Sequence, residues 1–116
     1  PGIRINGKLT LGENIADLAG LVIAYKAYHI SLHGKPAPVL NGYTGDQRFY
    51  LAYAQSWRQK NREATERARL LSNPHSPEDY RVNGVVRNDD NWYAAFPEIK
   101  PGEKYYLAPD KRVRLW

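Results

Sequence analysis

Apolar side chains recur every three or four positions over residues 12–32, and this spacing predicts the longest helix of the chain. We expect this helix to be buried on most sides, because few polar residues interrupt Ile15, Leu18, Ala19, Leu21, Val22, Ile23 and Tyr25. At its start, Thr10 and Glu13 have the spacing of a capping box, in which the two side chains bond free backbone amides. Gly34, followed by K-P-A-P, predicts its end.

A Pro/Gly/Asn-rich loop over residues 34–45 separates this helix from a second one. Thr44 and Gln47 repeat the capping-box spacing and predict the second helix start. One face of that helix is an aromatic stripe, made of Phe49, Tyr50, Tyr53, Ala54 and Trp57. Such a stripe is more often part of a core than a platform for stacking nucleic-acid bases, so we expect it to be buried.

The rest of the chain predicts shorter elements. A third helix is expected over residues 62–71, with an outer Glu63–Arg67 pair and a buried end at Leu70 and Leu71. Ser76 is expected to cap one short turn, and valines at 82, 85 and 86 favour an extended segment over 81–87. A short helix from residues 88–90 to 96 and an irregular tail, with Trp116 docked into the core, complete the prediction of a mainly α fold with short extended segments.

The composition narrows the possible functions only modestly. With 116 residues the chain can form one domain, and because it begins with Pro1 and has no Met we expect a piece of a longer protein. The net charge of +5 permits a nucleic-acid partner, but the basic residues are scattered, which favours ordinary solvated faces. The absence of cysteine excludes disulfides and thiolate metal sites. The longest apolar stretch, residues 18–28, is too short to span a bilayer.

Two histidines have the spacing of a zinc motif. His29 and His33 lie four apart in H-I-S-L-H, which resembles H-E-x-x-H, but Ile30 stands where that motif has its glutamate base. Histidine is also favoured in the last turn of a helix, where its charge meets the negative end of the helix dipole. We therefore expect these histidines to be structural.

Two carboxylates at the start of the long helix are harder to explain by structure alone. Glu13 and Asp17 lie four apart, so both point along one helix face. A capping role would account for Glu13. It does not account for Asp17, which lies in an apolar stretch where an unpaired carboxylate is costly to bury. Asp17 should therefore have a cationic or imidazole partner.

The segment around these carboxylates resembles a known family. NGKLTLGENIADLAGLVIAYKAY, and within it G-E-N-I-A-D, is similar to the third-ligand helix of the neprilysin family of zinc endopeptidases. The resemblance continues through YLAYAQSW, HSPEDYRVNGVVRN and the closing VRLW, and so covers nearly the whole chain. It implies that residues 1–116 are the C-terminal part of a thermolysin-like catalytic domain that hydrolyses peptide bonds in oligopeptides.

The resemblance also implies roles for individual residues. Glu13 matches the third protein ligand of the single zinc ion, and Asp17 matches the aspartate that orients a zinc-ligating histidine. His75, in H-S-P-x-x-x-R, matches the histidine that stabilises the oxyanion, and Arg81 matches the arginine that binds a substrate carbonyl. Val113 replaces a cysteine of animal members, which implies a bacterial protein.

One family motif is missing from the chain. It has no H-E-x-x-H, so the chain lacks the other two zinc ligands and the general base. We therefore expect it to be inactive alone, to hold no complete zinc site, and to need the remainder of the catalytic domain as its partner. Here Glu13 and Asp17 should be unpaired, hydrated or paired with something other than zinc.

The remaining expectations concern partners and location. The resemblance implies peptide substrates and an extracytoplasmic location (periplasmic, cell-surface or secreted), with no membrane contact by this segment. One alternative is a non-catalytic module that uses the same scaffold to bind peptides or proteins. An H-E-x-x-H motif upstream of Pro1 would support the enzyme, and its absence would support the module. A small basic nucleic-acid binder, which would bind oligonucleotides in a salt-sensitive way, is disfavoured by the dispersed charge and core-like aromatics.

Overall fold

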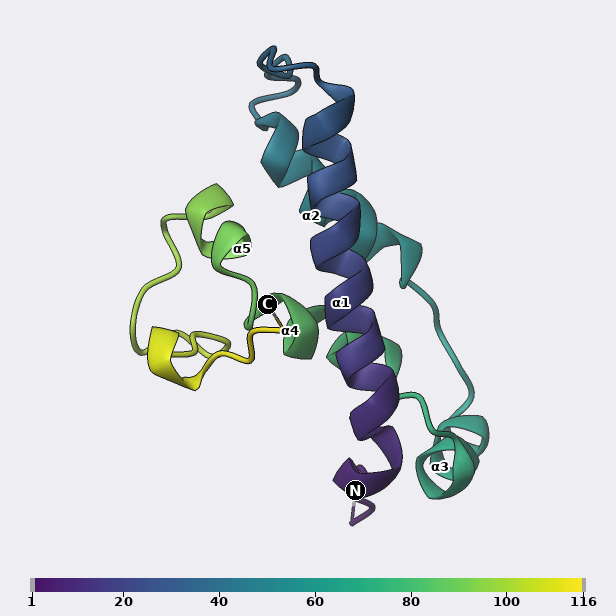
Figure 1. Cartoon of the computed structure of the whole chain (residues 1–116). Coiled ribbons are helices and arrows are strands. Elements are labelled where there is room, and N and C mark those ends of the chain that lie inside the picture. The colour runs from purple at the N-terminus through teal and green to yellow at the C-terminus, as the bar shows by residue number, and fades with distance from the viewer. Residues whose placement is uncertain (1, 116) are drawn as a thin grey trace.

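The computed structural model describes residues 2–115 and is mainly helical, as the sequence predicted (Figure 1). In chain order the helices are α1 (Gly7–Ser31), α2 (Gly45–Ser56), α3 (Glu63–Ser72), α4 (Glu78–Val86), α5 (Asp90–Ala95) and a 3₁₀ turn, η1 (Pro109–Lys111). Within the described residues, β pairing is confined to one isolated bridge between Leu40 and Tyr43. The predicted second, third and short fifth helices are therefore confirmed to within a residue or two.

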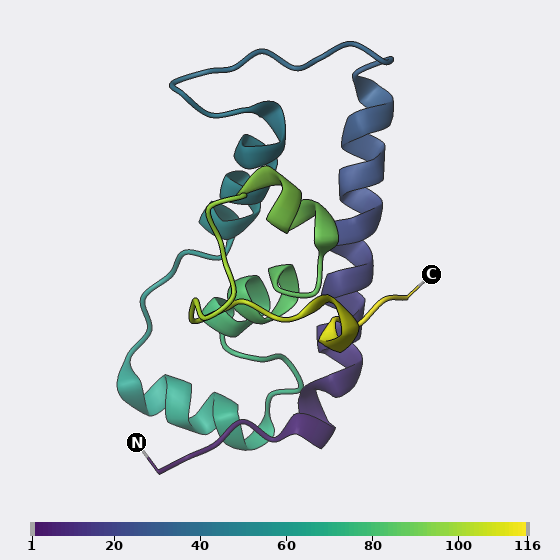
Figure 2. The same ribbon diagram turned by 90° about the vertical axis from the view of Figure 1, so that its left-hand side faces the viewer.

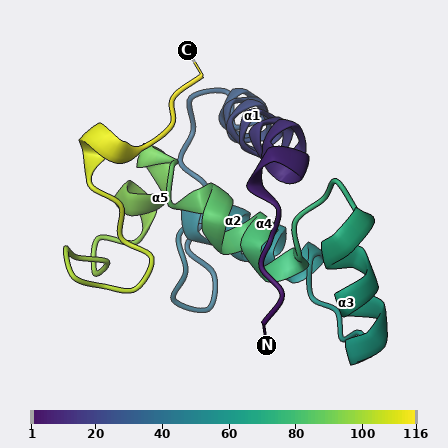
Figure 3. The same cartoon turned by 90° about the horizontal axis from the view of Figure 1, so that it is seen from below.

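The long helix α1 runs along one side of the molecule (Figure 2). The helices α2 and α4 pack against α1, and α5 packs against α2. The helix α3 stands apart near the N-terminal end of α1, as the view from below shows (Figure 3). The chain measures 47 × 31 × 26 Å, and its radius of gyration of 15.7 Å exceeds the value of about 13 Å typical of a compact domain of this length. The arrangement is open, and its core is small.

The core lies where α1 crosses α2 and α4. Its buried apolar residues are Leu18, Leu21, Tyr50, Val85 and Val86. The two valines belong to α4, so the prediction of an extended segment over residues 81–87 is wrong. β-Branched residues weaken a helix only slightly, by less than about 1 kcal/mol each. Burying a valine against α1 gains more, about 1.5–3 kcal/mol, so packing determines the conformation of this segment.

The start of α1 also differs from the prediction. Asn6, rather than Thr10, caps the helix, and its Oδ1 accepts a bond of 3.2 Å from the Leu9 amide. Thr10 is buried and donates its hydroxyl to the Asn6 carbonyl at 3.2 Å. The predicted capping box of Thr10 and Glu13 is therefore wrong, because the helix begins earlier and Glu13 lies in its second turn. The box of Thr44 and Gln47 at α2 is confirmed, with bonds of 3.0 and 3.1 Å.

Two expectations about burial are wrong. The face of α1 that points away from α2 and α4 leaves Ile23 57% and Ile30 74% exposed, so this helix is not buried on most sides. Leu71 at the end of α3 is 73% exposed, because α3 stands apart from the core. The Glu63–Arg67 pair is present at 3.9 Å. The predicted docking of Trp116 lies outside the described residues.

Candidate functional site

Glu13 and Asp17 lie one turn apart on α1, where Glu13 contacts the segment that leads from α3 into α4 and Asp17 contacts α4 itself. Glu13 Oε2 lies 3.2 Å from His75 Nε2, and the two side chains are 46% and 42% exposed. Because both side chains are nearly half exposed, water screens the interaction. The geometry makes this a weak pair that can be separated at little energetic cost.

Asp17 forms a far stronger pair with Arg81, in the first turns of α4. Arg81 donates Nε to Oδ2 at 2.7 Å and Nη2 to Oδ1 at 2.8 Å, and the side chains are only 14% and 17% exposed. The hydrogen bonds to Asp17 raise the pKa of Arg81, although burial opposes them, so the guanidinium stays charged. This is the cationic partner that the apolar surroundings of Asp17 require.

His75 is oriented by Asn73, two residues earlier. The Asn73 Oδ1 accepts a bond from the His75 amide at 2.9 Å and lies 3.1 Å from His75 Nδ1. With Glu13 at Nε2, both ring nitrogens face acceptor oxygens. These two contacts hold the ring in one orientation.

A buried serine fastens the His75 segment to α1. Ser76 is only 6% exposed and donates its hydroxyl to Asn14 Oδ1 at 2.7 Å. It does not cap α4, since Pro77 occupies the N-cap position, so the prediction for Ser76 is wrong. Sequence reasoning missed this bond, and the only signal was that Asn14 stands between Glu13 and Asp17 in G-E-N-I-A-D.

Two residues of the aromatic stripe also reach Arg81: Tyr53 on α2, and Trp57 directly after the end of that helix. The Trp57 ring lies beneath the Arg81 guanidinium, 3.9 Å from the ring centroid to Cζ. The Tyr53 hydroxyl donates to the Arg81 main-chain carbonyl at 2.8 Å. The sequence pattern predicted that both residues belong to the core. It could not indicate their contacts with Arg81, because Tyr50 of the same stripe has the same helical spacing and is a core residue.

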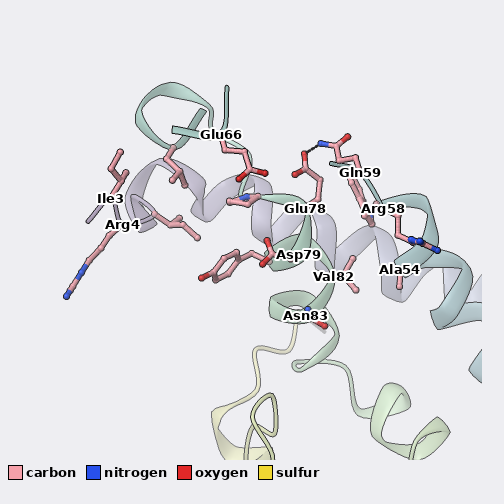
Figure 4. A pocket seen from close by; sticks show the side chains of 15 residues that line it. Ile3, Arg4, Ala54, Arg58, Gln59, Glu66, Glu78, Asp79, Val82 and Asn83 are labelled. Atoms are coloured by element: carbon pink, nitrogen blue, oxygen red, sulfur yellow. Dashed lines mark hydrogen bonds between the residues drawn. The ribbon is translucent and has the colours of Figure 1, made fainter. Parts of the chain in front are cut away.

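Two cavities adjoin these residues. The smaller, about 270 Å³, is lined by His75 and Arg81 together with polar side chains from the α2–α3 connection and α3. The larger, about 920 Å³, lies between the N-terminal segment, the end of α2 and the outer side of α4. At its rim Gln59 donates to Glu78, with Glu66 and Asp79 nearby (Figure 4). The smaller, polar cavity is the one lined by both His75 and Arg81.

The H-I-S-L-H histidines have other surroundings. His29 Nε2 lies 2.8 Å from Asp46 Oδ1, while Asp46 Oδ2 accepts the Tyr25 hydroxyl at 2.8 Å. His33 lies beyond the end of α1, in a left-handed conformation with φ of 51°. The pair therefore does not share one helix face, and His29 serves to tie α1 to the start of α2.

The site can supply part of a metal centre. Within residues 2–115, no three His, Asp or Glu side chains come together to hold a metal ion. Glu13 nevertheless has the donor that zinc accepts, a half-exposed carboxylate that lies 3.2 Å from His75. Both oxygens of Asp17 are already bonded to Arg81. Among the described residues, the donors at this site therefore fit one ligand of a zinc ion and no more.

Comparison with known proteins places these features in a family. A family model described as peptidase family M13 matches residues 2–113. The chain is 46% identical to human endothelin-converting enzyme-like 1, over 97% of the chain and 15% of that protein. It is 40% identical to neprilysin-1 of Caenorhabditis elegans, over 98% of the chain and 15% of that protein.

A solved structure extends the likeness to three dimensions. The inhibitor complex of the zinc metalloprotease Zmp1 of Mycobacterium tuberculosis matches with a TM-score of 0.94 and 50% identity, over 100% of this chain and 18% of that one. The chain belongs to peptidase family M13. It spans about 15% of the length of the curated relatives named above. The resemblance to the neprilysin family found in the sequence is thereby confirmed.

Proposed function

We propose that this chain is part of a zinc-dependent endopeptidase that hydrolyses peptide bonds in oligopeptides. The observation that carries the proposal is the meeting of Glu13 and Asp17 on α1 with His75 and Arg81, more than 60 positions away in the sequence. Membership of peptidase family M13 supports it. The likeness to a zinc metalloprotease structure supports the metal.

Glu13 is proposed as one protein ligand of the zinc ion, with an H-E-x-x-H helix elsewhere in the protein supplying the others. When bound, zinc would polarise the scissile carbonyl and activate a water molecule for attack. The half-exposed position of Glu13 supports this role, because the carboxylate can leave His75 at little cost.

Separation of Glu13 from His75 would free one ring nitrogen of the histidine. Once Glu13 turns to another partner, His75 Nε2 becomes free to donate a hydrogen bond to the developing oxyanion. Asn73 keeps the ring oriented meanwhile, through its contact with Nδ1. His75 would thus stabilise charge that appears only in the transition state.

Asp17 and Arg81 are proposed to act as a preorganised pair. The pair uses Nε and Nη2 of Arg81 and leaves Nη1 to donate to a substrate main-chain carbonyl. Asp17 would also accept a bond from a zinc-ligating histidine, which fixes the tautomer of that ring. Its carboxylate has lone pairs for both partners.

The partners follow from this function. We propose peptide substrates, the remainder of the catalytic domain, and an extracytoplasmic location, and we propose no nucleic-acid partner. Among the described residues, no helix has both the length and the apolar character needed to cross a membrane. We further propose that the chain alone does not cleave peptides, since it offers too few metal ligands.

The test uses the full-length protein that contains this chain. Its zinc content is measured by inductively coupled plasma mass spectrometry and its activity with a quenched fluorogenic oligopeptide. Glu13→Gln should lose zinc and lower kcat/KM at least about 100-fold, since Gln is a poor zinc ligand. The exposed control Glu98→Gln should retain both. A wild-type protein that neither binds zinc nor cleaves peptides would instead support the non-catalytic binding module.

A further inference from the structure

We propose that Tyr53 is a positioning residue for substrate binding, which acts by anchoring Arg81; this inference rests on the proposed function of Arg81. Tyr53 lies on α2, and its hydroxyl donates to the Arg81 main-chain carbonyl of α4 at 2.8 Å. The bond crosses between two helices and ends on the residue whose side chain is proposed to hold the substrate. Tyr53 itself touches neither the substrate carbonyl nor the reacting atoms.

The Tyr53 hydroxyl is a dependable donor. Burial, together with the nearby charge of Asp17, raises the pKa of Tyr53 to about 12. The proton therefore stays on the hydroxyl throughout the working range of a peptidase. Because the acceptor is a main-chain oxygen, no titration on that side can break the bond either.

Trp57, the residue directly after α2, extends the same anchor. Its ring meets that of Tyr53 edge to face, with centroids 6.4 Å apart and planes at 75°. Its face supports the Arg81 guanidinium at 3.9 Å. Tyr53 therefore orients both the backbone of Arg81 and the aromatic surface on which the guanidinium rests.

Three contacts from two helices thus fix the arginine. Tyr53 anchors its backbone, Trp57 covers one face of the guanidinium, and Asp17 of α1 binds the Nε and Nη2 edge. The Nη1 group remains outside the pair, and Arg81 lines the polar cavity shared with His75. An arginine held in this way loses little further side-chain freedom when it binds a carbonyl.

Removing only the Tyr53 hydroxyl should therefore weaken substrate binding more than it slows the chemical step. In the full-length peptidase, Tyr53→Phe should raise KM about three- to tenfold, the factor that one net hydrogen bond represents. kcat should change by less than about twofold, because Arg81 holds the substrate equally before and in the transition state. Replacement of Tyr53 by 4-aminophenylalanine restores an N–H donor at the same ring position and should bring KM back toward the wild-type value.

The chain offers a matched control in Tyr93. Its hydroxyl also donates to a main-chain carbonyl, that of Arg87, at 2.8 Å, and it accepts the Leu107 amide at 3.0 Å. Tyr93→Phe removes the same chemical group from a position outside the site. It should lower the melting temperature at least as much as Tyr53→Phe while leaving KM unchanged.

A double-mutant cycle with Arg81 makes the assignment specific. Arg81→Lys should raise KM by losing the planar fork of donors. Tyr53→Phe added to that variant should then change KM by less than about twofold, since the group it positions is already gone.

Each other outcome points to a distinct failure. If Arg81→Lys raises KM and Tyr53→Phe does not, the positioning role is wrong while the proposed function stands. Equal effects of Tyr53→Phe and Tyr93→Phe, or full additivity with Arg81→Lys, would reduce Tyr53 to a structural residue. If the wild-type protein cleaves no peptide, or if Arg81→Lys leaves KM unchanged, the proposed role of Arg81 fails and this inference fails with it.

Discussion

Removal of either partner from the pair of Asp17 and Arg81 should strongly destabilise this chain. Its bonds are 2.7 and 2.8 Å long, and the side chains are 14% and 17% exposed. Two unit charges about 4 Å apart attract by about 4 kcal/mol at an effective dielectric constant of about 20, before the cost of desolvation is subtracted. Removal of one partner leaves a buried charge unpaired and typically costs about 3–5 kcal/mol.

We expect Asp17→Asn to lower the free energy of unfolding by about 3 kcal/mol, at the lower end of this range, because water can still solvate part of the unpaired Arg81 charge. Arg81→Met should cost somewhat more, since it also removes the contact with the Trp57 ring, worth about 1 kcal/mol. The double variant should lose clearly less than the sum of the two, with a coupling free energy of about 2 kcal/mol. For a domain with typical stability of about 5–15 kcal/mol, each single change is severe.

Urea unfolding of the chain, followed by far-ultraviolet circular dichroism, measures these free energies. The control is the exposed pair Glu63–Arg67, at 3.9 Å with side chains 78% and 47% exposed. Its cycle should give a coupling of only about 0.3–0.5 kcal/mol. A coupling for Asp17 and Arg81 that is no larger than that of the control would refute the argument that burial makes this pair strong.

Other positions give independent tests. Glu13→Gln should change the unfolding free energy of the chain by less than about 0.5 kcal/mol in urea titrations, since its pair is half exposed. Gly45→Ala should lower the melting temperature, because the new Cβ would overlap neighbouring side chains. Gly20→Ala, with open space around the new Cβ, should raise the free energy of unfolding by about 0.5–1 kcal/mol. Burial raises the pKa of Asp89, so the folded protein binds a proton at this residue more tightly than the unfolded protein does. Acidification from neutral pH should therefore increase the contribution of Asp89 to the free energy of unfolding. In urea midpoints measured at several pH values, Asp89→Asn should abolish this part of the pH dependence.

The helices were predictable where a local signal agreed with the packing. The capping box at Thr44 and the aromatic spacing after it both favour α2, and nothing in the fold opposes them. The segment over residues 81–87 failed because its valines have a strand preference that is weak beside the burial of Val85 and Val86 against α1. That burial depends on a contact with a helix some 65 positions earlier, which no local pattern contains.

The candidate site was predictable in part for a similar reason. The cost of burying Asp17 in an apolar stretch indicated that a partner must exist, and the family resemblance named Arg81 and His75. Neither argument showed which of these two residues pairs with Asp17 and which with Glu13, because that choice depends on how α4 packs against α1. Tyr53 and Trp57 carried no signal at all, since an aromatic residue that packs in a core and one that packs on an arginine have the same helical spacing.

The two carboxylates of G-E-N-I-A-D differ in burial, and this difference orders their proposed roles. Glu13 is about half exposed, and water screens its contact with His75, so little free energy would oppose its transfer from His75 to a metal ion. Asp17 is mostly buried, and its bidentate bond would have to be broken at high cost. Asp17 should therefore keep Arg81 when the metal centre assembles and accept the ligating histidine as an added partner. On this argument, the arginine proposed to bind substrate would be in place before zinc or substrate arrives.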